Sequence, residues 1–236
     1  TIYKYNISGS EVSQWTYGST GYSITTDGTY LYRGHASSSD TPIWRTKISD
    51  HTTDTLTCTT NYGGPQSNQG SIFVHHDGKI YTRREGGNNY LDIIDLSNLS
   101  VTRKSSSDFG IGSYSDGGAA VTTLAGKSYI VEVADNAWYY YDIEAGSVTK
   151  VSQGSSTSTE YAQGGGEIAP GVALVFGEQS DRVTTIDMNT KTYSTDTGSH
   201  GYTTDYSYGN RFGFASYLER SSEFTYSAYA AGIEIT

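Results

Sequence analysis

The segment "HHDGKIY" (His75–Tyr81) places Asp77-Gly78 between two runs that alternate apolar and polar residues. An Asp-Gly pair in that setting predicts a β-hairpin with a tight turn. A second alternating pair follows in "YLDIIDLSNLSVT" (Tyr90–Thr102), with a polar turn at its centre. These residues therefore predict two consecutive hairpins, which together make a four-stranded antiparallel meander.

The same unit of two hairpins recurs along the chain. First turns are predicted at Asp27-Gly28, Asp77-Gly78, Ala125-Gly126, Pro170-Gly171 and Gly209-Asn210. Their spacing is about 50, 48, 45 and 38 residues. Second hairpins are predicted in Ile43–Thr57, Tyr90–Thr102, Trp138–Thr149, Val183–Ser194 and Glu223–Thr236. Self-similarity at this period is typical of a repeat architecture.

Three of the second hairpins carry an acid where the strand enters the turn, namely Asp95, Asp142 and Asp187. A short carboxylate at that position can accept hydrogen bonds from backbone N–H groups of the turn. The alternative role is metal binding, but the three acids belong to different repeats. We therefore expect them to stabilise turns.

Composition supports an all-β chain and excludes several classes of protein. The 236 residues include 28 Gly, 22 Tyr and only 3 Pro, and no window combines helical periodicity with helix caps. The net charge of −10 would repel nucleic acid, and no basic stripe offsets it. No apolar run is long enough for a membrane helix, and the single cysteine, Cys58, excludes an intrachain disulfide.

Repeated four-stranded meanders resemble the β-propeller superfamily, of the general kelch-like or NHL-like kind. The resemblance covers essentially the whole chain and implies one domain of five four-stranded blades, with six as the alternative. The expected repeats span about 19–69, 70–116, 117–163, 164–203 and 204–236. No Trp-Asp series and no double-glycine series marks every repeat, so the functional residues of no particular family carry over.

The segment Thr1–Trp15 is an extra second hairpin without a first hairpin of its own. It is expected either to complete a blade begun by the C-terminal segment, closing the ring with both chain ends, or to be the remnant of a sixth blade. We therefore assign residues 1–18 to none of the five repeats.

A tyrosine lies in each connection between one predicted blade and the next. These residues are Tyr17, Tyr62, Tyr114, Tyr161 and Tyr202, and the polar residues Asn68, Gln69, Asp116, Gln163 and Asp205 lie close to them. Two interpretations remain open. The rings can pack between blades, or they can form a binding face for sugars or for another protein, because tyrosine combines an apolar ring with a polar tip. Nearby glycines such as Gly21, Gly118 and Gly165 are expected where the innermost strands approach closely.

The sequence evidence for a catalytic or metal site is weaker than the evidence for a binding face. His75 and His76 are adjacent in a predicted strand, so they point to opposite faces. Some five-bladed propellers are glycoside hydrolases, for which the available carboxylates are Asp116, Glu160, Glu167 and Asp205. Calcium is an alternative for the loops that contain Asp50, Asp54 and Asp108, although neither matches a calcium-binding loop motif. No catalytic residue, no metal and no cofactor is expected.

The sequence favours an extracellular or particle-surface binding module that recognises a glycan or a surface receptor through the tyrosine-bearing loops. Sequons at Asn6 and Asn98 and the Tyr, Ser, Thr and Gly content point to a location outside the cell. A structural or assembly domain, self-associating or within a larger appendage, is the first alternative, and a glycoside hydrolase is the second. The start at Thr1 fits either a processed or a trimmed chain.

Overall fold

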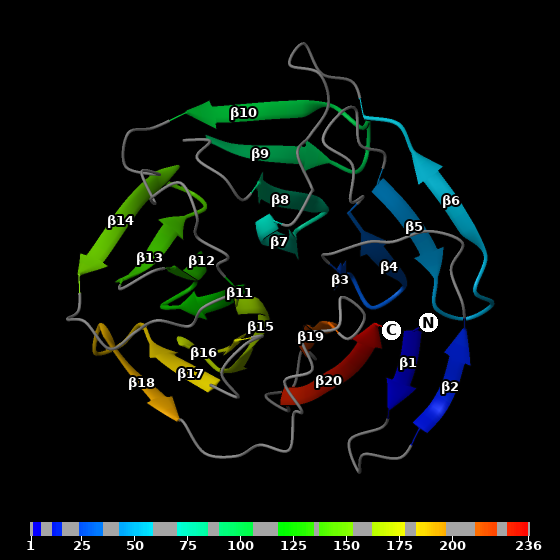
Figure 1. Ribbon diagram of the computed structural model, residues 1–236. Helices are drawn as coiled ribbons and strands as arrows, with labels where there is room; N and C mark the ends of the chain where they lie inside the picture. The colour runs from blue at the N-terminus through cyan, green and yellow to red at the C-terminus, as the bar shows by residue number, and fades with distance from the viewer. Residues whose placement is uncertain are drawn as a thin grey trace.

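The computed structural model describes residues 2–5, 11–15, 24–34, 43–58, 70–84, 90–105, 118–134, 137–152, 162–177, 183–196, 211–220 and 226–235. Within these ranges the strands form five four-stranded antiparallel sheets, arranged as blades around a central axis (Figure 1). The all-β propeller class expected from the alternating runs is confirmed.

Four blades each consist of four strands that are consecutive in the sequence. Blade 1 contains β3 (Ile24–Thr26), β4 (Tyr30–Arg33), β5 (Ile43–Lys47) and β6 (Thr53–Leu56). Blade 2 contains β7 (Gly70–His76), β8 (Lys79–Arg84), β9 (Tyr90–Asp95) and β10 (Val101–Ser105). Blade 3 contains β11 (Gly118–Leu124), β12 (Lys127–Ala134), β13 (Ala137–Asp142) and β14 (Ser147–Ser152). Blade 4 contains β15 (Ala162–Ala169), β16 (Val172–Gly177), β17 (Val183–Asp187) and β18 (Thr192–Asp196).

Blade 5 joins the two ends of the chain. Its strand order is β19 (Arg211–Arg220), β20 (Tyr226–Ile235), β1 (Ile2–Tyr5) and β2 (Glu11–Trp15), and Ile2 pairs with Ile235. The N-terminal hairpin thus completes a sheet begun by the C-terminal hairpin, which is the first of the two alternatives above. Both chain ends lie side by side in Figure 1.

The prediction of the hairpins in the last repeat is wrong. Arg211–Arg220 pairs with Tyr226–Ile235 along its whole length, so Glu223–Thr236 is not a second hairpin. The first turn of this blade therefore falls in 221–225, and Gly209-Asn210, where we expected it, lies outside the described residues. Alternation alone predicts that a run is a strand but not which run it pairs with, and here the N-terminal hairpin supplies the outer strands.

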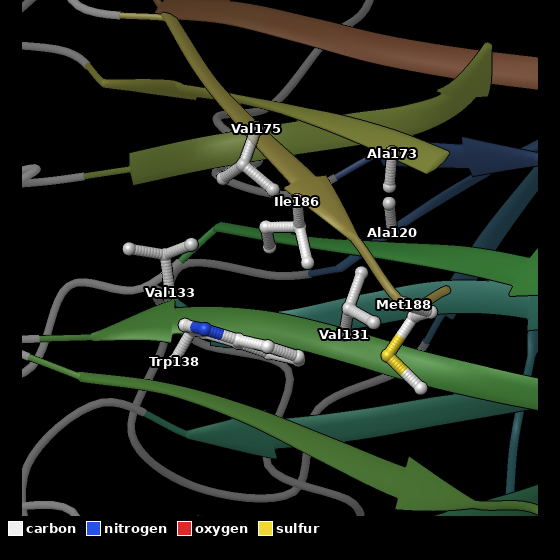
Figure 2. Packing of buried hydrophobic residues seen from close by; sticks show 8 residues of the cluster. All are labelled: Ala120, Val131, Val133, Trp138, Ala173, Val175, Ile186 and Met188. Atoms are coloured by element: carbon white, nitrogen blue, oxygen red, sulfur yellow. The ribbon is translucent and has the colours of Figure 1, made fainter. Parts of the chain in front are cut away.

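The hydrophobic core is divided among the seams between neighbouring blades. The seam between blades 3 and 4 contains Ala120, Val131, Val133, Trp138, Ala173, Val175, Ile186 and Met188 (Figure 2). The seam between blades 2 and 3 is built around Leu91 and Ile130, and the seam between blades 1 and 2 around Ile43, Ile80 and Ile94. Ile130 and Val131 belong to different seams because successive side chains of a strand point to opposite faces. Blades 2 and 3 therefore bury both faces.

The innermost strands approach closely enough to require glycine at one position. A Cβ atom on Gly165 of β15 would lie 2.3 Å from the carbonyl oxygen of Leu174 and 3.2 Å from Cβ of Ala120 in blade 3. The reason expected for glycine at the strand entrances is confirmed at this residue. Gly21 lies outside the described residues.

Candidate functional site

The two faces of the ring differ in how the strands are joined. The short turns within the hairpins of blades 1 to 4 lie at one face, which we call the turn face. The strand ends joined by 16–23, 57–69, 106–117, 153–161 and 197–210, from one blade to the next, lie at the opposite face, which we call the connection face. The second and third strands of blades 1 to 4 also join there, because connections in an antiparallel meander alternate between its two ends.

Carboxylates stabilise the outer turns of the turn face. The backbone N–H groups of Ser97, Ala145 and Asn189 donate to Oδ1 of Asp95, Asp142 and Asp187, respectively, over 2.8–2.9 Å. The turn-stabilising role predicted for these three acids is confirmed. Hydrogen bonds from Ser97 and Asn189 also lower the pKa values of Asp95 and Asp187.

Each outer turn is also bonded to the inner turn of the same blade. The donor is the backbone N–H that follows the third strand, and the acceptor is a carbonyl of the first hairpin. The pairs are Ile48 to Thr29 at 3.0 Å, Leu96 to Gly78 at 3.0 Å, Ile143 to Ser128 at 3.1 Å and Met188 to Gly171 at 2.7 Å. The turn face of blades 1 to 4 is therefore held by one repeated backbone bond, to which carboxylate bonds are added in the outer turns of blades 2 to 4.

The residues considered for calcium have other partners. Asp50 accepts from the backbone and hydroxyl of Thr52 and pairs with Lys47, which together lower the pKa of Asp50 to about 2. Asp54 pairs with Arg45 at 2.9 Å. Asp108 lies outside the described residues. In the part of the chain that the structure describes, no group of three His, Cys, Asp or Glu residues is arranged to hold a metal ion.

Three charged side chains of the described strands are buried within the blades, and two of them lie toward the connection face. Among the described residues, the charged side chains that are almost fully buried are Arg33 at 6%, Asp92 at 0% and Glu132 at 3% exposure. Arg33 ends β4 and Glu132 lies two residues before the end of β12, so both are near the connection face, whereas Asp92 lies halfway along β9. Charged residues are rarely this deeply buried without a specific role in structure or binding.

Two of these charges have defined partners within their blades. Arg103 of β10 donates two hydrogen bonds to Asp92, from Nε at 2.7 Å and from a terminal nitrogen at 2.8 Å. This fork geometry satisfies both carboxylate oxygens. The guanidinium carbon of Arg33 lies 4.3 Å from the ring centroid of Trp44, its neighbour on β5.

Sequence reasoning missed these residues. Each interrupts a strongly apolar run, as in "YLYRG" (Tyr30–Gly34), "YLDII" (Tyr90–Ile94) and "YIVEV" (Tyr129–Val133). A charge within such a run is a usable signal, but alternation also allows it to face solvent. Only the packing of blades on both sides of the strand shows that the charge is buried.

The residues predicted to bind ligand lie almost entirely outside the described part of the chain. Gln163 is the second residue of β15, and the structure describes only its backbone. The others are Tyr17, Tyr62, Tyr114, Tyr161, Tyr202, Asn68, Gln69, Asp116 and Asp205, and all fall in the segments that join one blade to the next. Their role as a binding face stays a prediction.

Among the carboxylates considered for glycoside hydrolysis, only Glu167 is described. Its Oε1 atom accepts from the hydroxyl of Thr122 at 2.9 Å and from the backbone N–H of Thr123 at 2.7 Å. Glu167 therefore links the innermost strands of blades 3 and 4. Asp116, Glu160 and Asp205 lie outside the described residues.

The adjacent histidines lie near the turn face. His75 stacks on Tyr32 of blade 1 with ring centroids 5.9 Å apart, and its backbone N–H donates to the hydroxyl of Thr25 at 2.9 Å. Burial lowers the pKa of both His75 and His76. Burial, together with a hydrogen bond from the Tyr32 hydroxyl to Asp27, raises the pKa of Tyr32. These contacts hold the seam between blades 1 and 2.

No protein-family model and no curated protein sequence matches the chain. Solved structures do match its fold. The WD40 repeats of RRP9 superpose with a TM-score of 0.53 at 7% identity, over 78% of this chain and 53% of that one. Virginiamycin B lyase from Staphylococcus aureus matches with a TM-score of 0.52 at 12% identity, over 99% of this chain and 73% of that one.

A nidogen/laminin complex also contains a similar chain, with a TM-score of 0.53 at 10% identity, over 80% of this chain and 67% of that one. This chain spans about half the length of the U3-55K and RRP9 chains that it matches. At these identities the likeness shows the fold, a β-propeller, and leaves the function to the residues of the chain itself. No helix among the described residues is long and apolar enough to cross a membrane.

Proposed function

We propose that this propeller is a non-enzymatic binding module, displayed outside the cell or on a particle surface, that recognises a glycan or a surface receptor through its connection face. The observation that carries the proposal is the placement of Arg33 and Glu132, buried near that face at 6% and 3% exposure. Deeply buried charge is expensive unless it is paired or hydrogen-bonded, and such groups cluster at functional sites and in structural ion-pair networks.

The contrast with the turn face favours the same choice. There the outer-turn acids are engaged in the turns themselves, as with Asp95 and Asp187. The segments that join the blades at the opposite face carry Tyr17, Tyr62, Tyr114, Tyr161 and Tyr202. Tyrosine is favoured at binding surfaces because it offers a rigid apolar ring and a hydroxyl group. Binding residues commonly lie on loops that a rigid scaffold positions.

The chemistry of these segments suits sugars or a polar protein surface. Amide and carboxylate groups of Asn68, Gln69, Asp116 and Asp205 accompany the tyrosines in sequence. Shallow sites of this type bind with dissociation constants of about 1 μM to 1 mM, so useful avidity would need several copies. Because the segments differ in length and residues, one or two sites are a better expectation than five equal ones.

The test is a glycan-array and cell-binding screen of the purified chain together with Tyr114→Ala and Tyr161→Ala. Matched controls are Lys127→Ala and Glu144→Ala, which replace exposed side chains on the turn face. The proposal expects binding that is lost in the tyrosine variants and kept in the controls, with unchanged circular dichroism. Cell binding without a glycan signal would indicate a protein receptor.

Two results would contradict the proposal. Equal loss of binding in the turn-face controls would show that binding is not specific to the connection face. Tyrosine variants that only melt earlier, with no binding by any variant, would instead favour a structural or assembly domain, which light scattering would then test through self-association.

A further inference from the structure

The described part of the chain contains two Asp-Gly turns in equivalent hairpins, and their carboxylates differ sharply in environment. Asp27-Gly28 joins β3 to β4 in blade 1, and Asp77-Gly78 joins β7 to β8 in blade 2. Both lie on the turn face. An Asp-Gly peptide is the sequence most exposed to attack by its own backbone nitrogen, because glycine has no Cβ to hinder the approach.

The carboxylate of Asp27 is held by three donors. Its Oδ1 atom accepts from the backbone N–H groups of Thr29 at 2.8 Å and Tyr30 at 2.6 Å. Its Oδ2 atom accepts from the hydroxyl of Tyr32 at 2.8 Å. The N–H of Gly28, the group that would have to attack, donates to the hydroxyl of Thr26 at 3.0 Å. Reaction at this turn would break several bonds at once.

The carboxylate of Asp77 has no comparable restraint. Asp77 and Gly78 are both exposed, and in the described part of the chain no hydrogen bond or ion pair holds the Asp77 side chain. Both residues have positive φ, 46° for Asp77 and 69° for Gly78, so the turn is a strained one for aspartate. A Cβ built on Gly78 would meet no atom within 4 Å, which leaves room for a ring to form beside this residue.

We infer that Asp77-Gly78 is a site of spontaneous aspartate isomerisation in the folded protein, and that Asp27-Gly28 is protected. The Gly78 nitrogen attacks Cγ of the protonated Asp77 carboxyl group, a new N–Cγ bond forms, and the hydroxyl group leaves as water. The product is a five-membered succinimide. Water then adds to one of its two carbonyls, so one water is lost and one is gained.

The two directions of hydrolysis have different products. Addition of water at Cγ breaks the N–Cγ bond and restores aspartate. Addition at the main-chain carbonyl breaks the original peptide bond and leaves isoaspartate, in which the chain continues through the side chain and gains one methylene. No oxidant, reductant or enzyme is required.

Isoaspartate at this position would disturb more than the turn. The carbonyl of Gly78 accepts from the backbone N–H of Leu96 at 3.0 Å, which ties the inner turn of blade 2 to its outer turn. The adjacent pair His76 and Lys79 closes the β7–β8 ladder. An added methylene shifts both contacts, so the ageing protein is expected to loosen first in blade 2.

The test ages the full chain near neutral pH in water enriched in oxygen-18, folded or in urea. Each passage through the succinimide adds about 2 Da, whichever product forms, and fragmentation of tryptic peptides 5–33 and 48–79 reports Asp27 and Asp77 separately. In the folded chain, label at Asp77 is expected to exceed label at Asp27 by about tenfold or more, because the Asp27 bonds must break first. In urea the two rates should converge.

Two variants make the assignment specific. Tyr32→Phe removes one donor to Asp27 and Thr26→Val removes the acceptor of the Gly28 N–H, so each should raise label at Asp27 without changing Asp77. Asp77→Ser should abolish the label in peptide 48–79 that maps to this turn. Equal labelling of Asp27 and Asp77 in the folded wild-type chain would overturn the inference.

Discussion

At the scale of single residues, the space and the dihedral angles available to the backbone determine where glycine is needed. Gly165 has ordinary φ, yet its missing side chain lets β15 pass the carbonyl oxygen of Leu174 and Cβ of Ala120. Gly126 is the reverse case, with a positive φ of 78° and no atom near a built Cβ. The two glycines are needed for different physical reasons, and substitution separates them.

Gly165→Ala is expected to lower the free energy of unfolding by about 3 kcal/mol, because the added methyl group forces the backbone apart in a packed interior. Gly126→Asn is the control, and it should cost about 1 kcal/mol or less, since asparagine tolerates positive φ. Denaturant unfolding measures both. Equal losses would contradict the close approach at Gly165.

The buried pair of Asp92 and Arg103 is the other strong constraint at this scale. Arg103→Met leaves the Asp92 carboxylate buried without its fork-like partner, and about 3–5 kcal/mol of stability should be lost. The double variant Asp92→Leu with Arg103→Met should recover most of that loss, because no isolated charge remains. Chemical unfolding of the three proteins provides the measurement. A double variant less stable than Arg103→Met alone would contradict this account.

At the scale of elements, each strand hairpin packs against its neighbours along two seams. In the seam between blades 1 and 2, the ring of His75 stacks on Tyr32, and Asp27, Asp77 and His76 lie within electrostatic range. Burial is the main cause that lowers the pKa of His75 from 6.5, and Asp27 and Asp77 oppose it only partly. This seam therefore favours the neutral imidazole.

Because the unfolded chain binds a proton at His75 more readily than the folded chain does, stability should fall as the pH drops below about 6.5. His76 contributes with the same sign, since burial lowers its pKa too. His75→Gln should flatten part of this dependence, which thermal melting between pH 5 and 8 would show. A wild-type melting temperature that rises on acidification would contradict the sign.

At the scale of the whole molecule, the ring depends on contact between the chain ends. Blade 5 takes two strands from each end, and Ile2 pairs with Ile235. Closure leaves no wide gap between first and last blade, which is how propellers protect their edges. Contacts close in space but far apart in sequence must therefore form before the ring is complete.

Deletion of residues 1–15 removes β1 and β2 and should lower the melting temperature by about 10 °C or more, or abolish a cooperative transition. A circular permutant provides the control. It joins residue 236 to residue 1 through a short linker and opens the chain within 106–117, so every strand is kept. This permutant should melt close to the wild type. A deletion variant as stable as the wild type would show that the N-terminal hairpin is dispensable.

The local sequence pattern determined many of the strands and turns of this protein. Asp-Gly and related turns, flanked by alternating runs, predicted the inner hairpins of blades 1 to 4, and the acids Asp95, Asp142 and Asp187 were correctly assigned to turns. These features depend on residues a few positions apart, where turn geometry and the two-residue period of a strand fix the outcome. The tyrosines predicted as a binding face lie outside the described residues, so that prediction still awaits its experiment.

Tertiary structure alone decided what depends on distant partners. The pairing of β19 with β20 replaced the hairpin expected in Glu223–Thr236, because strand pairing is chosen by the whole ring and not by alternation. The burial of Arg33, Asp92 and Glu132 also required the neighbouring blades, since either face of an isolated strand can meet water. Sequence periodicity determined the strands and turns of this propeller, and packing between blades determined which charges are buried.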